Sequence, residues 1–229
     1  MTQPAPVPAP AAAPAAASAP ASASAPAPVD FYFDFISGYG YFASLRIEAI
    51  AARHGRSVNW HSMLLGVSVM KVMGLKPLLE TPLKGDYVLN DAARYARRHG
   101  LTLARQVSDP MMDPRPAARA FYWVRRHHPG REAAFARAVF DRYWRLGKDL
   151  SDPAEMAAVA AAEPALGLSA AALVEGQASD ESRNDLREAV AASIERGVFG
   201  SPFIVVDGEA FWGSDRLELV DDWLTRGGW

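Results

Sequence analysis

The residue with the clearest chemical potential in this chain is Ser37, which directly follows an aromatic segment. Residues 29–36 (VDFYFDFI) are rich in phenylalanine and alternate in character, which predicts a buried strand. Ser37 then falls at or just before the start of a helix, where serine is a preferred N-cap. The same hydroxyl could also donate a hydrogen bond to a thiolate held at the helix start and lower the pKa of that thiol.

The sulfur of such a thiolate must come from a ligand, because the 229 residues include no cysteine. This absence excludes disulfides, thiolate metal sites and a redox couple carried by the protein. The five histidines include no pair with metal-ligand spacing, and four of them lie at predicted helix ends. We therefore expect no metal site, and a Ser-His-Asp hydrolase has little support.

A second segment of interest is residues 200–203 (GSPF), which place Ser201 and Pro202 just before a predicted strand. A proline in that position is ordinary by itself. If the peptide bond were cis, however, the loop would present the backbone N–H and C=O of Ser201 to an extended peptide ligand.

Residues 211–218 (FWGSDRLE) open the last predicted helix, and Asp215 with Glu218 forms a capping-box pattern. An alternative interpretation is a clamp on an amino-acid head, in which the N–H groups around Ser214 take a carboxylate and Asp215 takes an ammonium. Lys84, which precedes another predicted helix, is either solvated surface or the partner of a nearby anion.

The elements that must position these residues follow a recognisable order. We predict a strand at 29–36, a helix at 39–54, a strand at 58–64, mostly helical residues from 66 to 197, a hairpin at 203–212 and a helix at 214–224. This β-α-β, all-helical, β-β-α order predicts an α/β, thioredoxin-like (DsbA-like) fold with a large helical insertion. In that fold Ser37 occupies the usual place of the reactive cysteine.

Composition sets the expected domain boundaries and excludes several partners. In residues 1–28, 21 are Ala or Pro and none is charged, so we expect a disordered tail and no secretory signal. Residues 29–65 and 198–229 form the predicted thioredoxin-like domain, and 66–197 the helical insertion domain. A net charge of −2 and the lack of a long apolar run argue against nucleic acid and membrane partners, with the cytoplasm as the expected location.

Four motifs, in order, resemble those of a known family. Residues 31–44 (FYFDFISGYGYFAS) resemble the F-Y-F-D-F-x-S-P-Y-S-Y opening of bacterial 2-hydroxychromene-2-carboxylate isomerases, relatives of the kappa-class glutathione transferases. The later matches are residues 82–87 with Asp91 and Arg94, residues 198–202, and residues 211–217. The resemblance covers residues 29–226 and implies glutathione as cofactor, an aromatic small-molecule substrate and, by analogy, a homodimer.

The resemblance also implies roles for individual residues. Ser37 matches the catalytic serine that bonds the glutathione sulfur, and Lys84 matches the lysine that reaches the glycyl carboxylate. The remaining cofactor-binding positions are Ser201 with Pro202 at the cysteinyl part, and Ser214 with Asp215 at the γ-glutamyl part.

The chain departs from the family pattern at four places, namely Gly38 and Gly40 instead of Pro and Ser, and Leu75 and Asp113-Pro114 where Asn is common. The sequence therefore favours a glutathione-dependent isomerase of 2-hydroxychromene-2-carboxylate, interconverted with trans-o-hydroxybenzylidenepyruvate, or of a similar aromatic oxo acid. A kappa-like transferase that consumes glutathione, and a non-catalytic thioredoxin-like binding module, stay open as alternatives.

Overall fold

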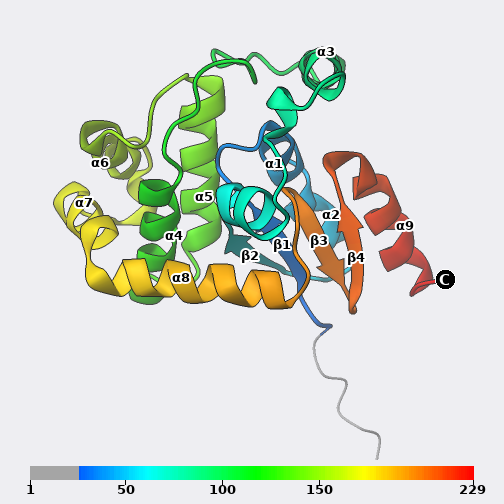
Figure 1. Ribbon diagram of the computed structural model, residues 1–229. Coiled ribbons are helices and arrows are strands. Elements are labelled where there is room, and N and C mark those ends of the chain that lie inside the picture. Colours follow the sequence, from blue (N-terminus) through cyan, green and yellow to red (C-terminus); the bar gives the residue numbers. More distant parts are fainter. Residues whose placement is uncertain (1–25) are drawn as a thin grey trace, which may run out of the picture.

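A four-stranded mixed sheet lies at the centre of the computed structural model, which describes residues 26–229 (Figure 1). The strand order is β2-β1-β3-β4, with β1 parallel to β2 and the other neighbours antiparallel. The strands are β1 (Val29–Phe33), β2 (Val58–Ser62), β3 (Phe203–Val206) and β4 (Glu209–Trp212). The sheet thus joins segments from both ends of the chain, as the predicted fold class requires. The predicted disordered tail, residues 1–28, lies mostly outside the described residues.

The segment predicted as one helix from 39 to 54 forms two short helices, α1 (Gly38–Ser44) and α2 (Ile47–Arg53). The hydroxyl of Ser44 donates to the carbonyl of Tyr41 at 2.6 Å, and the N–H of Arg46 bonds the carbonyl of Ala43. These local hydrogen bonds replace the regular helical ladder and end α1 after seven residues. The single long helix was therefore a wrong prediction.

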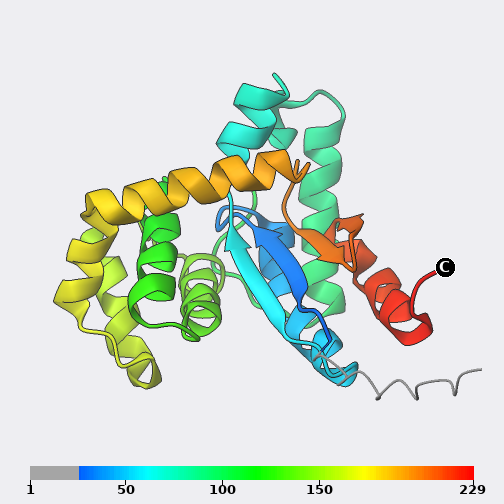
Figure 2. The same ribbon diagram turned by 90° about the horizontal axis from the view of Figure 1, so that it is seen from below.

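The predicted helical insertion is confirmed as a series of helices between β2 and β3. They are η1 (Gly66–Val72), η2 (Leu78–Glu80), α3 (Lys84–Arg98), α4 (Arg115–His127), α5 (Glu132–Phe140), η3 (Asp141–Arg145), α6 (Pro153–Ala162), η4 (Pro164–Leu166), α7 (Ala170–Ala178) and α8 (Asp180–Glu195). The helix α8 runs from the far side of the insertion back to the sheet, where β3 begins (Figures 1 and 2).

The chain closes with the predicted hairpin and a final helix. Asp207 and Gly208 both have positive φ, at 52° and 90°, which suits the tight turn between β3 and β4. The turn η5 (Ser214–Arg216) then leads into α9 (Leu217–Arg226). The predicted capping box is absent, because Asp215 caps neither element and Glu218 pairs instead with Arg46 on the first half of the fold.

One buried core extends from the sheet into the insertion. Phe33 at the end of β1 lies at its centre, fully buried and packed against other aromatic rings. Those rings, whose centroids are 5.1 to 5.6 Å from that of Phe33, belong to Phe31, Phe35, Trp60, Phe121 and Phe140. Phe121 on α4 and Phe140 on α5 belong to the insertion, so its helices share the core of the sheet.

Within residues 26–229, no helix combines the length and the apolar character needed to cross a membrane. The pairs Tyr122-Trp123 and Tyr143-Trp144 are mainly core residues, since Tyr122, Tyr143 and Trp144 are buried. These side chains therefore pack α4 and η3 into the core.

We predict that Phe33→Ala lowers the free energy of unfolding by about 3–5 kcal/mol, because it removes the ring that joins the sheet core to the insertion core. Urea unfolding followed by tryptophan fluorescence measures the change. Leu219→Ala is the matched control, since Leu219 is 40% exposed on α9 and its truncation should cost little. A loss below 1 kcal/mol for Phe33→Ala would contradict a shared core.

Candidate functional site

Ser37 caps helix α1 and is nearly buried, with 8% of its surface exposed. Its Oγ accepts a hydrogen bond from the N–H of Gly40 at 3.0 Å and donates one to the backbone carbonyl of Ser201 at 2.9 Å. The N-cap interpretation is therefore correct, and the hydroxyl also faces the second segment singled out from the sequence. Since α1 has only seven residues, the argument for an anion at this place depends on the hydroxyl and not on a long helix dipole.

The Ser201-Pro202 peptide bond is cis, and the loop that contains it faces the start of α1. The carbonyl of Ser201 is occupied by the Ser37 hydroxyl. Among the described residues no acceptor pairs with the N–H of Ser201. The Ser201 side chain is half-buried, and its Oγ accepts a hydrogen bond from the N–H of Asp34 at 2.9 Å.

The position of the Ser201 hydroxyl explains why residue 40 is a glycine. A Cβ at residue 40 would lie 2.7 Å from Ser201 Oγ and 3.3 Å from Ser37 Oγ. The distance to Ser201 Oγ is shorter than real Cβ contacts, so a side chain here would collide with that hydroxyl. At Gly38, by contrast, a Cβ would meet nothing nearer than 3.4 Å, in the ring of Trp144. Gly40 therefore makes room for the hydroxyl of Ser201, whereas Gly38 is not required by space.

A buried carboxyl group, Asp34, lies directly behind these two serines. One of its carboxyl oxygens accepts from the N–H of Ile36 at 3.2 Å and the other from the N–H of Leu65 at 2.8 Å. Its backbone carbonyl accepts from the N–H of Ser37 at 3.0 Å. Burial raises the pKa of Asp34 to about 7, although the N–H groups of Leu65 and Ile36 act in the opposite direction.

The third predicted segment is joined to the proline loop through the backbone. The N–H of Gly213 donates to the carbonyl of Pro202 at 3.1 Å, which places η5 next to the loop, and η5 also packs against α1. Ser214 is buried, whereas the side chain of Asp215 is 71% exposed and lies 3.4 Å from Arg216. The structure thus brings three of the four predicted segments together around the start of α1.

Lys84 is not brought into contact with the other predicted residues. It is exposed at the first position of α3, and within residues 26–229 it forms no ion pair. Its turn is tightly built, because Leu83 has a φ of 68° and a Cβ at Gly85 would collide with the carbonyl of Leu79.

A hydrogen bond fixes the helix of Lys84 to the helix of Ser37. The hydroxyl of Tyr39 on α1 donates to the carboxylate of Asp91 on α3 at 2.7 Å, and Arg94 pairs with the same carboxylate. Desolvation by burial and the adjacent Asp91 raise the pKa of Tyr39, so this hydroxyl keeps its proton. Asp91 and Arg94 therefore have a positioning role that the sequence motif alone did not reveal.

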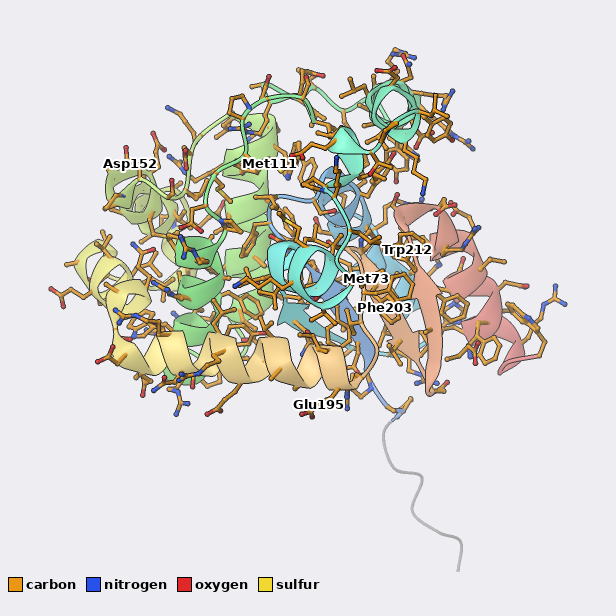
Figure 3. All side chains as sticks on the ribbon, in the orientation of Figure 1. Met73, Met111, Asp152, Glu195, Phe203 and Trp212 are labelled. Atoms are coloured by element: carbon orange, nitrogen blue, oxygen red, sulfur yellow. The ribbon has the colours of Figure 1, made fainter. Side chains whose placement is uncertain are left out.

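Aromatic surface borders the proline loop. The ring of Phe199 lies 5.1 Å from that of Phe203 and 4.9 Å from that of Trp212, and Phe199 and Trp212 are 38% and 57% exposed. Figure 3 shows Phe203 and Trp212 on the two strands of the hairpin, with Met73 in front of them in that view. Exposed aromatic faces beside polar groups are suited to a flat organic ligand.

The sequence reasoning missed Asp34, the side chain of Ser201 and the Tyr39–Asp91 bond. For Asp34 a signal was present, since a carboxylate between two phenylalanines in an otherwise apolar strand must find buried donors. The other two depend on contacts between segments that lie far apart in the chain, and no local pattern indicates them.

Comparison with known proteins matches this arrangement to described families. A family model for the DSBA-like thioredoxin domain matches residues 28–225. The solved structure of a 2-hydroxychromene-2-carboxylate isomerase superposes with a TM-score of 0.74 at 27% identity, covering 86% of this chain and 94% of that one. These matches confirm the fold class and the resemblance inferred from the motifs.

Two curated relatives span nearly the same length. A 2-hydroxychromene-2-carboxylate isomerase from Sphingobium xenophagum is 29% identical over 197 residues, which cover 86% of this chain and 97% of the relative. Glutathione S-transferase kappa 1 from Homo sapiens is 31% identical over 207 residues, covering 84% and 88%.

We predict that Asp34 makes the protein less stable as the pH rises from about 4 to 7. The folded state keeps the Asp34 proton up to a pKa of about 7, whereas the unfolded chain releases it near 3.8, so the unfolded state binds fewer protons in this window. Above pH 7 this contribution is constant. In Asp34→Asn the dependence is removed, so the stability of wild type relative to the variant should fall over this range.

Urea unfolding at a series of pH values measures this difference. Asp222→Asn is the control, since Asp222 lies on α9 and pairs with Arg226 at the surface. A constant difference between wild type and Asp34→Asn from pH 4 to 8 would show that Asp34 does not titrate as its burial requires.

Proposed function

This chain belongs to the DSBA-like thioredoxin domain family, and within it we propose a glutathione-dependent isomerase of 2-hydroxychromene-2-carboxylate or a similar aromatic, unsaturated oxo acid. The observation that carries the proposal is the Ser37 hydroxyl, which faces the Ser201 carbonyl at 2.9 Å in the place of the family's reactive cysteine. The isomerases among the relatives support the reaction class.

The hydrogen bonds at the two serines fit a bound cysteinyl residue. An N–H from the ligand can replace Ser37 as donor to the Ser201 carbonyl. A ligand carbonyl can accept from the N–H of Ser201, which has no acceptor among the described residues. The Ser37 hydroxyl is then released to turn its proton to the ligand's sulfur, while its oxygen still accepts from the N–H of Gly40. A charge-assisted hydrogen bond of this kind favours the thiolate over the thiol.

Groups complementary to the charged ends of glutathione lie on η5 beside the proline loop and on α3. The exposed carboxylate of Asp215 suits the γ-glutamyl ammonium, and the N–H groups of the turn at Ser214 suit its carboxylate. Lys84, which forms no ion pair within the described part of the chain, suits the glycyl carboxylate, and the Tyr39–Asp91 bond holds its helix to α1.

When bound, glutathione supplies a thiolate that adds reversibly to the conjugated double bond, so that the bond becomes single, rotates and re-forms as the sulfur leaves. The protein's part is to keep the sulfur deprotonated with Ser37 and to orient the substrate. The exposed rings of Phe199 and Trp212 offer an aromatic surface beside the proline loop for that purpose.

A second candidate function is a kappa-like glutathione transferase, which is favoured by the 31% identity to the human kappa enzyme. It would use the same sulfur site but release a conjugate. The stoichiometry separates the two, because an isomerase regenerates glutathione whereas a transferase consumes one molecule in each turnover.

We predict that the purified protein isomerises 2-hydroxychromene-2-carboxylate only when glutathione is present, without consuming it. Ser37→Ala should lower the rate about ten-fold or more, the effect of removing one hydrogen bond to a charged group. The assay follows the substrate absorbance and titrates free thiol at the end. Ser44→Ala, which removes a buried hydroxyl from the same helix, is the control. Full activity of Ser37→Ala would refute the role of Ser37.

For Lys84→Gln we predict a glutathione Kd raised about two- to five-fold, because an exposed ion pair with the glycyl carboxylate contributes up to about 1 kcal/mol. Isothermal titration measures the Kd, and the effect should diminish in high salt. Lys148→Gln is the matched control, since Lys148 pairs with Glu155 in the insertion. An unchanged Kd for Lys84→Gln would place the glycyl end elsewhere.

A further inference from the structure

The hydroxyl groups of Ser37 and Ser201 differ in how many of their hydrogen-bonding groups are already engaged. The hydroxyl of Ser37 both donates, to the Ser201 carbonyl, and accepts, from the N–H of Gly40. The hydroxyl of Ser201 accepts from the N–H of Asp34, but in the part of the chain that the structure describes no acceptor takes its proton. The Ser201 proton is therefore the available donor before any rearrangement of the loop.

The position of this hydroxyl is fixed from two sides. The N–H of Asp34, at the end of β1, points to its oxygen, and the backbone of Asp34 is itself held by the bond from the N–H of Ser37 to its carbonyl. On the other side, the absence of a side chain at Gly40 leaves the space that the Ser201 hydroxyl occupies. The point where a residue-40 Cβ would lie is 2.7 Å from Ser201 Oγ and 3.3 Å from Ser37 Oγ, so both hydroxyls converge on it.

Accessibility favours Ser201 as well. Ser37 is nearly buried, whereas Ser201 is half-buried. A bond from the Ser201 hydroxyl to a ligand would also leave the cap of helix α1 in place. The backbone N–H of the same residue has no acceptor within residues 26–229, so Ser201 can offer two donors to one ligand.

We propose that the side-chain hydroxyl of Ser201 is a second hydrogen-bond donor to the sulfur of the bound thiol, acting together with Ser37 and made possible by the glycine at position 40. This inference rests on the proposed function, because it takes glutathione as the ligand. The inference goes beyond the proposed function because it assigns two hydroxyl groups to the sulfur site. The Ser201 hydroxyl can donate to the sulfur without giving up a hydrogen bond that it already donates.

The test is the pKa of the glutathione thiol in its complex with the protein, measured from the ultraviolet absorbance of the thiolate as a function of pH. Ser201→Ala should raise that pKa by about one pH unit, the effect expected for one charge-assisted hydrogen bond. The rate at neutral pH should fall about ten-fold and recover as the pH is raised. A purely structural role of the side chain would not shift the pH profile in this way.

Three further variants make the result specific. Ser201→Thr keeps the hydroxyl and should keep the low thiol pKa. Gly40→Ala should raise the thiol pKa while Ser201 is intact, because the new Cβ displaces its hydroxyl, whereas Gly38→Ala, with more space, should not. Ser193→Ala removes a buried hydroxyl that bonds the carbonyl of Val190 within α8, and it serves as the control for loss of a buried serine.

The outcomes separate the two proposals. If the wild-type protein does not bind glutathione, the proposed function fails and this inference fails with it. If wild type binds glutathione and Ser37→Ala raises the thiol pKa, but Ser201→Ala and Gly40→Ala leave it unchanged, only the second donor is refuted. Since Gly40→Ala keeps serine at position 201 and only moves its hydroxyl, it tests the inference even if Ser201→Ala does not fold.

Discussion

The site depends on how one buried residue, Asp34, satisfies its polar groups at the end of β1. A carboxyl group without solvent must find hydrogen-bond donors, and an unpaired one is costly. Asp34 uses the N–H groups of Ile36 and Leu65 for its side chain, and Ser37 and Ser201 for its backbone. Asp34 thereby joins three segments, namely the start of the insertion at Leu65, the start of α1 and the proline loop. These bonds also fix the positions of the two serine hydroxyls.

The architecture could be predicted because its signals are local. The aromatic residues of β1, the β-branched run of β3, the tight turn at Gly208 and the long helical stretch between the strands are all local signals, and together they indicate the order of elements along the chain. The failures are equally informative. The long first helix breaks where the Ser44 hydroxyl bonds the carbonyl of Tyr41, and Glu218 leaves the expected capping box to pair with Arg46 in the turn before α2. A local hydrogen bond decided the first case and a tertiary contact the second.

At the site, residue types could be predicted but the hydrogen-bond assignments could not. The motifs singled out Ser37, Ser201, Ser214 and Asp215, and the structure groups these residues around α1, whereas Lys84 stays apart from them. The Ser37 hydroxyl donates to the Ser201 carbonyl, whereas the Ser201 hydroxyl accepts from the N–H of Asp34. Both partners are backbone groups, which residue types do not reveal. Only the folded backbone distinguishes a serine that caps a helix from one that also bonds the proline loop.

The close approach of residue 40 to Ser201 also restricts how the chain can change over evolutionary time. A side chain at position 40 and a hydroxyl at position 201 compete for one small volume, so the two positions form a single unit of substitution. A side chain gained at position 40 requires the Ser201 hydroxyl to move or residue 201 to change. Because the two positions lie at opposite ends of the chain, recombination between relatives would combine residues at 40 and 201 that were not selected together.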